Sequence, residues 1–245
     1  MNRRDFVLRS TAAAAFAMTV ERGITGGALL PLPSSEFAFA RLRYASGNWD
    51  ADPNMPTNLL HALAAHTRLR LDARERIIDA TSNDLFAHPF LYLTGNRTVQ
   101  FTPRERERLR HYLRSGGFLF VDDCEHDING EFARSFEAEL SLVLDHPEER
   151  LRALPNDHEL YRAYFDFPAG PPTTSHEVNG WGDRLVHPYL RGAWVGNRLA
   201  VLYSNKDYGC EWNYDPRSGC FMAHDTTRFG VNIIVYALRN AARPR

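Results

Sequence analysis

The sequence contains no apolar run that approaches the roughly 20 residues of a membrane-spanning helix. It also has no excess of charge, because 29 Lys and Arg residues stand against 30 Asp and Glu residues, which leaves no basic field for nucleic acid. Five motifs are missing: G-x-G-x-x-G, G-x-x-x-x-G-K, G-x-S-x-G, H-E-x-x-H and C-x-x-C. Their absence argues against nucleotide cofactors, serine esterase chemistry and the common zinc-protease chemistry.

Cysteine is scarce, with three residues in the chain. Cys210 and Cys220 flank the turn-rich stretch EWNYDPRSG, so they are the pair that a disulfide would join in an oxidising compartment. That pairing would leave Cys124 as a thiol.

The N-terminal segment predicts export. Arg3 and Arg4 precede Asp5, Phe6 and a short Ala-rich segment, an order that resembles the twin-arginine signal. We therefore expect residues 1–30 to be a twin-arginine signal peptide and linker. The corresponding translocation machinery would be a partner, and the mature protein would be periplasmic or otherwise exported. The remaining length suits one domain, over residues 36–240.

The central section predicts a parallel sheet. Residues 90–93 and 118–121 are short apolar runs, typical of strands that are buried on both faces. Between them, Thr102 and Glu105 predict a capping box at the start of a helix, and a further helix is expected over 131–144. Strands that alternate with helices through short joints predict an α/β fold, a three-layer sandwich with a mostly parallel central sheet.

The flanking sections predict the remaining elements. Residues 155–183 are rich in Pro and Gly and are expected to form long loops with short elements. We predict a first strand at 36–44, a helix at 57–66, short strands at 69–71 and 77–79, a hairpin of 192–195 with 199–203, and a buried final helix capped by Asp225 and ending near Arg239.

The stretch FLFVDDCEHDING, residues 118–130, places polar side chains where ligands commonly bind. In open parallel sheets, ligands lie outside the carboxyl ends of the strands, and Asp122 and Asp123 leave the sheet at that edge. Asn205 and Asp207 would join them if their strand is also parallel. The other residues expected at this edge are Asn48, Trp49, Asp50 and Asn96.

This stretch has three interpretations. Cys124 could be a nucleophile with His126 or His176 as its base, although no helix follows it directly and the two aspartates disfavour a thiolate. In the structural interpretation, one aspartate caps local backbone amides and the others face water. In the third, the stretch contributes to a divalent-metal site, with ligands drawn from Asp122, Asp123, His126, His176 and Glu177.

The candidate residues form two groups. The candidate catalytic residues are Asp122, Asp123, His176 and Glu177, with Asp123 as base or ligand anchor, although adjacent side chains in an extended segment point apart. The candidate ligand-binding residues are Asn48, Trp49, Asn96, Asn205, Asp207 and Trp212, with Trp49 as a stacking surface. Spacing alone defines no metal-ligand set, and a divalent metal is the one cofactor kept as an alternative.

Several longer motifs resemble one bacterial family. FARLRYASGNWDADPNMPTNLL, PFLYLTGN, TPRERERLRHYLRSGGFLFVDDC, HEVNGWGD and AVLYSNKDYGCEW are together similar to the family called domain of unknown function 4159, over roughly residues 37–240. The resemblance implies a flavodoxin-like fold similar to class I glutamine amidotransferases. It does not imply glutamine hydrolysis, because the tight nucleophile elbow is missing. Gly95-Asn96 stands where the family often has Gly-His.

The sequence therefore predicts an exported protein that binds or hydrolyses a small molecule or carbohydrate in a polar cleft at the carboxyl edge of the sheet. The alternative is a non-catalytic interaction module of a cell-envelope assembly. Loops that line one deep pocket with raised carboxylate pKa values would favour an enzyme, and splayed loops beside an apolar patch would favour the interaction module.

Overall fold

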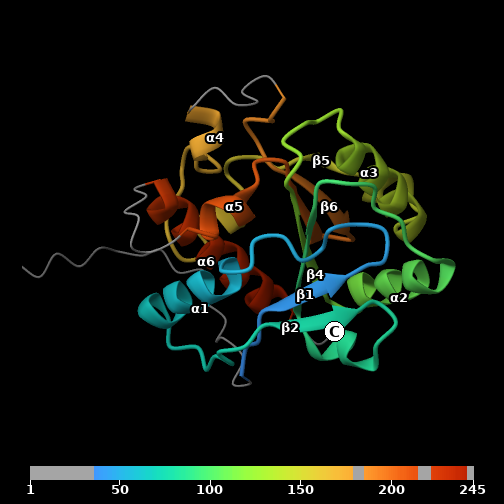
Figure 1. Ribbon diagram of the computed structural model, residues 1–245, viewed down its shortest axis with the longest axis horizontal. Coiled ribbons are helices and arrows are strands. Elements are labelled where there is room, and N and C mark those ends of the chain that lie inside the picture. The colour runs from blue at the N-terminus through green and yellow to red at the C-terminus, as the bar shows by residue number, and fades with distance from the viewer. Residues whose placement is uncertain (1–35, 179–184, 215–221, 242–245) are drawn as a thin grey trace, which may run out of the picture. The chain divides into compact units, whose positions relative to one another are not determined.

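A computed structural model of the chain describes residues 36–178, 185–214 and 222–241 (Figure 1). The predicted signal segment, residues 1–30, lies outside the described residues. Among the helices of the described part, none combines the length and the apolar character that crossing a membrane requires.

The centre of the fold is a seven-stranded sheet in the order β2-β1-β3-β4-β7-β6-β5. Neighbouring strands from β2 to β7 pair in parallel, whereas β6 is antiparallel to both of its neighbours. This arrangement confirms the predicted, mostly parallel sheet. The strands are β1 (Ala40–Arg43), β2 (Arg76–Asp79), β3 (Phe90–Gly95), β4 (Phe118–Asp123), β5 (Arg152–Ala153), β6 (Arg191–Val195) and β7 (Arg198–Ser204).

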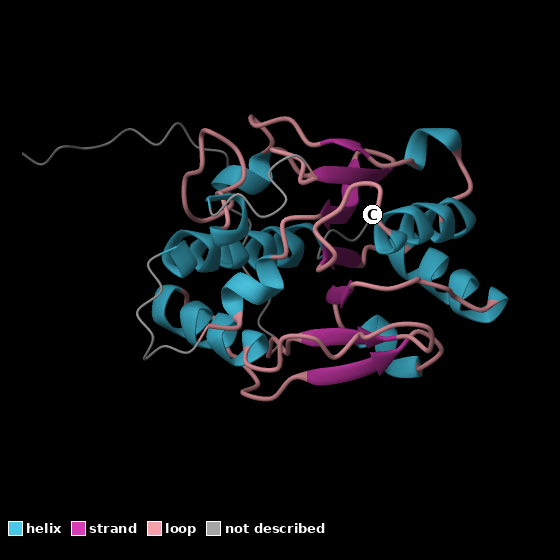
Figure 2. Cartoon of the chain, turned by 45° about the horizontal axis from the view of Figure 1, so that its top comes forward, coloured by secondary structure: helices cyan, strands magenta, loops and turns pink. Residues whose placement is uncertain are grey.

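Helices cover both faces of this sheet, as Figure 2 shows. One face packs against α1 (Met55–His66), α5 (Tyr208–Trp212) and α6 (Met222–Ala241), and the other packs against α2 (Pro103–Arg114) and α3 (Glu131–Val143). Short elements complete the chain: α4 (Ser175–Val178), η1 (Asn83–Ala87), η2 (Pro147–Glu149) and η3 (Glu159–Arg162). The result is the predicted three-layer sandwich, in agreement with a flavodoxin-like architecture.

The apolar runs of the central strands fill two separate cores. On β3, Phe90 and Tyr92 belong to the core beneath α1 and α6, while Leu91 and Leu93 belong to the core beneath α2 and α3. Successive side chains of a strand point to opposite faces, so a strand covered on both faces has no polar alternation. This explains why β3 and β4 read as continuous apolar stretches.

Local signals predicted most element boundaries correctly. Thr102 and Glu105 form the expected capping box at α2, and β6 and β7 form the expected hairpin. Two predictions were wrong. Leu71 makes an isolated bridge to Phe37 and belongs to no strand. The final helix begins at Met222, so Asp225 lies in its first turn instead of capping it, where its charge still favours the helix N-terminus.

Candidate functional site

The carboxyl ends of β3, β4 and β7 lie side by side. Gly95 pairs with Asp123 and Asp122 pairs with Ser204, because β4 is parallel to both of its neighbours. The loop after β7 therefore leaves the sheet beside the loop after β4. Asp207 was predicted to lie at this edge if the strand before it is parallel, and β7 is parallel to β4.

Asp122 anchors helix α5 to the sheet. Its carboxylate accepts hydrogen bonds from the backbone N–H groups of Tyr208, at 3.1 Å, and Gly209, and from the Tyr92 hydroxyl at 3.3 Å. The side chain is fully buried. Burial, followed by the charge of Asp207, raises the pKa of Asp122 well above its usual range. Its contacts are those of a structural residue that positions the loop of Asp207.

Asp123 points away from Asp122 and is also buried. One oxygen accepts from the Tyr203 hydroxyl at 2.6 Å, and the other accepts from the backbone N–H of Glu125 at 2.8 Å. Burial is the main cause that raises the pKa of Asp123 to about 7.

The raised pKa of Asp123 makes stability depend on pH. The folded protein holds this proton more tightly than the unfolded chain, where the pKa is near 3.8. The contribution of Asp123 to the unfolding free energy is therefore fully present below about pH 4 and is lost as the pH rises through about 7. We expect the Asp123→Asn variant to gain up to about 3 kcal/mol in unfolding free energy relative to wild type between pH 5 and pH 8.

Urea unfolding of both proteins across this range measures the difference, with the exposed Asp157→Asn as matched control. A constant difference between Asp123→Asn and wild type at every pH would show that Asp123 is ionised in the fold throughout.

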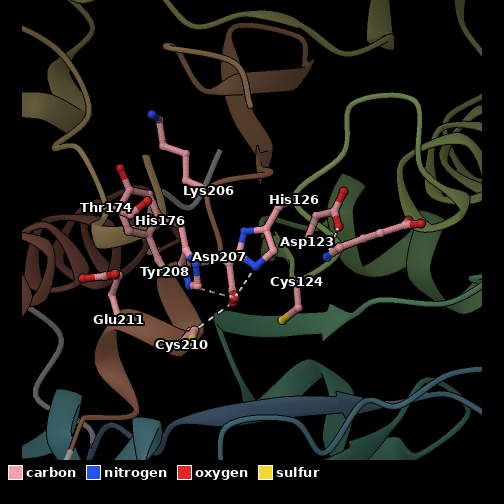
Figure 3. A network of polar contacts seen from close by, with 12 residues as sticks. Asp123, Cys124, His126, Thr174, His176, Lys206, Asp207, Tyr208, Cys210 and Glu211 are labelled. Atoms are coloured by element: carbon pink, nitrogen blue, oxygen red, sulfur yellow. Dashed lines mark hydrogen bonds and ion pairs between the residues drawn. The ribbon is translucent and has the colours of Figure 1, made fainter. Parts of the chain in front are cut away.

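Asp207 is the centre of the polar network in Figure 3. One carboxylate oxygen, Oδ2, lies 3.0 Å from Nε2 of His126 and 3.9 Å from Nε2 of His176. The other oxygen, Oδ1, accepts from the backbone N–H of Cys210 at 3.2 Å and so caps α5. The two imidazole rings lie 4.3 Å apart, centroid to centroid. Burial lowers the pKa of His126, but the hydrogen bond and charge of Asp207 outweigh it, and the net pKa is raised.

Asp52 and Cys124 also lie close to Asp207, with ligand atoms of the three residues within 4.8 Å of one another. The Cys124 sulfur lies 2.9 Å from Oγ1 of Thr94 and 3.8 Å from Oδ2 of Asp52. Burial and then the Asp207 charge raise the pKa of Cys124 well above its usual range, which opposes the thiolate that a nucleophile needs. The same two causes raise the pKa of Asp52 to about 6. We call Asp52, Cys124, His126, His176 and Asp207 the Asp207 cluster.

Backbone strain is concentrated in this cluster. Among the described residues, three that are not glycine have a positive φ: Asp52 at 58°, His126 at 58° and Asp207 at 53°. All three belong to the Asp207 cluster, although they come from three separate loops. Left-handed backbone is costly for residues with a Cβ atom and tends to occur where a function requires it.

Some predicted residues serve the scaffold instead. Glu177 pairs with the buried Lys206 and accepts from Thr174, so it diverges from its neighbour His176 on α4. The Asn205 side chain accepts from the backbone of His187 and donates to the carbonyl of Leu185. These contacts hold the segments around the cluster and leave both side chains outside it.

The remaining candidates divide between core and rim. Trp212 is 1 % exposed, stacks on Tyr208 and donates to the carbonyl of Thr226, so it offers no face to a ligand. Asn48 accepts from the backbone N–H of the exposed Asn96 at 3.0 Å, and the partly buried Trp49 packs against the core beneath α2 and α3. Cys220 lies outside the described residues, so its pairing with Cys210 stays a prediction.

Asp52 was not among the residues predicted for the site, although it lies in the turn-rich loop ASGNWDADPNMP. Its carboxylate reaches the cluster because Arg41, from β1, holds the loop by donating to the carbonyls of Trp49 and Ala51, at 3.2 and 2.6 Å. Gly209 allows the close approach, because an added Cβ would lie 2.8 Å from Oδ2 of Asp52. An Asp followed by Pro in a loop at a strand end is the one signal that could have indicated it.

A mostly parallel sheet, helices on both faces and a polar cluster at the carboxyl edge define an α/β sandwich protein of the flavodoxin-like kind. Residues 38–238 match a family described as a domain of unknown function (DUF4159), and the chain belongs to that family. A comparison with curated proteins found no match to the chain.

Proposed function

We propose that the protein binds a small polar molecule, such as a carbohydrate or a related ester, at the Asp207 cluster and hydrolyses it. The observation that supports this proposal is the meeting of three strained, non-glycine residues from three loops at one group of ionisable side chains. Packing alone gives no reason for such a coincidence, whereas a site that must hold fixed groups in fixed directions does.

The chemistry of the cluster suits hydrolysis. Hydrolysis requires a group that takes a proton from water and a group that stabilises or protonates the departing atom. Asp52, with a pKa of about 6, exchanges protons near neutrality, and the imidazole of His126 lies 3.0 Å from Oδ2 of Asp207, where it would help to polarise the bound molecule. Asn48 and Asn96, on the neighbouring loops, would contact the polar groups of the bound molecule.

The proposed setting is outside the cytoplasm. The Arg3-Arg4 pattern and the Ala-rich segment that follows support export by the twin-arginine pathway, and a periplasmic location would bring the cluster to extracytoplasmic carbohydrates and esters. The alternative proposal for this setting is a non-catalytic module of an envelope assembly.

The test is an assay of the purified chain without residues 1–30 against panels of glycosides and esters. We expect turnover that falls about 100-fold or more in kcat/KM in both Asp52→Asn and Asp207→Asn. The control, Asp157→Asn, should retain wild-type turnover, because Asp157 is exposed and outside the cluster. Turnover that both cluster variants retain would place the chemistry elsewhere. An inert wild-type protein that co-purifies with envelope proteins would favour the interaction module.

A further inference from the structure

Three residues of the cluster present metal-binding atoms to one point. His126, His176 and Asp207 each offer one ligand atom, and these atoms all lie within 4.8 Å of one another. They come from three different elements: the loop after β4, helix α4 and the loop after β7 (Figure 3). A charge cluster on one loop commonly faces water without an ion, but convergence from three elements needs the whole fold to produce it.

The distances fit coordination to a single ion. For Zn²⁺ bound tetrahedrally, bond lengths of about 2.0–2.1 Å place neighbouring ligand atoms about 3.4 Å apart. The carboxylate oxygen of Asp207 lies 3.0 Å from Nε2 of His126 and 3.9 Å from Nε2 of His176. Both separations are within about half an ångström of the ideal, and all three ligand atoms lie within 4.8 Å of one another, so side-chain rotations would bring them to one ion.

The charge around Asp207 favours a cation. In the described part of the chain, the ion pairs of Asp207 are with these two histidines. Arg41 is bound to Glu75 and to loop carbonyls, and Lys206 is bound to Glu177. The two imidazole rings are 4.3 Å apart. One divalent ion held between them and the buried carboxylate would balance the charge of Asp207.

The ligand set itself indicates the class of ion. Two imidazoles and one carboxylate bind Zn²⁺ in hydrolases, and they bind Fe²⁺ and similar transition metals in other enzymes, with positions left open for water or substrate. Oδ1 of Asp207 is fixed by the backbone N–H of Cys210, which directs Oδ2 toward the histidines, as outer contacts do for metal ligands.

We propose that His126, His176 and Asp207 form a binding site for a divalent transition-metal ion of the Zn²⁺ class. The role of the ion, which would be to activate the hydrolytic centre, rests on the proposed function. The ligand set differs from the one that the sequence suggested. Of that earlier set, Asp122, Asp123 and Glu177 are engaged by α5, Tyr203 and Lys206.

Metal binding can be measured on the chain without residues 1–30, with no substrate present. After removal of bound metal with a chelator, the protein is titrated with Co²⁺, followed by visible absorption, and with Zn²⁺, followed by calorimetry. We expect one equivalent to bind, with Co²⁺ bands that indicate mixed nitrogen and oxygen ligands. His176→Ala and Asp207→Asn should each weaken the affinity on the order of 100-fold or more.

The matched control is His61→Ala, which removes an exposed histidine outside the cluster and should leave the affinity unchanged. Asp207→Asn keeps an oxygen that can cap α5, and circular dichroism checks that each variant is folded. A folded wild-type protein that binds neither ion, or binding that survives both ligand variants, would overturn the inference. Metal binding without turnover would overturn the proposed hydrolysis alone, and turnover in the metal-free protein would overturn the role of the ion in that hydrolysis.

Discussion

Asp122→Ala is expected to lower the unfolding free energy by about 3 kcal/mol. The substitution removes the acceptor of two backbone N–H groups, of Tyr208 and Gly209, and of the Tyr92 hydroxyl, all in a buried region. Each donor left without a partner costs about 1–3 kcal/mol, offset in part by the removal of a buried carboxyl group. For a domain of this size the loss corresponds to a decrease of about 6–12 °C in Tm.

Urea unfolding and thermal melts measure this loss, with Asp157→Ala as the exposed control. Asp122→Asn should fall between Asp122→Ala and wild type, because it keeps one acceptor oxygen but places an NH₂ group against a backbone N–H. If Asp122→Ala were as stable as wild type, the carboxylate would not be the anchor of α5, and the position of Asp207 would need another explanation.

Arg41→Ala is expected to lower the unfolding free energy by about 2–4 kcal/mol and to abolish turnover. Arg41 is almost fully buried and joins Glu75 to the carbonyls of Trp49 and Ala51. Its removal leaves these groups without their donor and releases the loop that carries Asp52. Arg41→Lys should recover part of the stability but little of the turnover, because a lysine lacks the fork that reaches several acceptors at once.

Arg43 provides the matched control on the same strand. Arg43 forms a bidentate ion pair with the Asp79 carboxylate, with hydrogen bonds of 2.7 and 2.6 Å, but its side chain is 51 % exposed. Exposed ion pairs contribute little because water screens them, so Arg43→Ala should cost far less stability than Arg41→Ala and leave turnover unchanged. Equal losses from Arg41→Ala and Arg43→Ala would show that the loop carrying Asp52 does not depend on Arg41.

Short-range signals made much of the fold predictable. The apolar runs of β3 and β4 and the capping box of α2 depend on residues close in sequence, and the structure confirms them. The same signals led to errors where tertiary packing decides the outcome. Residues 69–71 have strand-like composition but extend the sheet by one bridge only, and the final helix begins at Met222, before the predicted cap at Asp225.

The sequence predicted where the candidate site lies, but not which residues form it. Parallel topology brings Asp122, Asp123 and Asp207 to one edge, and the sequence supports that much. Which carboxylate faces a backbone amide and which faces a histidine depends on long-range contacts and on left-handed backbone at Asp52, His126 and Asp207. A sequence contains no direct record of either, because Asp and His adopt left-handed backbone more often than most residues but still at only a small share of their positions.

Because Asp207 has two roles, occupancy of the Asp207 cluster is coupled to the local unfolding of helix α5. The same carboxylate caps α5 and faces both histidines, while Asp122 holds the first N–H groups of that helix. Whatever occupies the cluster therefore also makes local unfolding of α5 less favourable. The amide hydrogens of Tyr208, Gly209 and Cys210 become natural reporters of occupancy, whose exchange with solvent should slow whenever the cluster is filled.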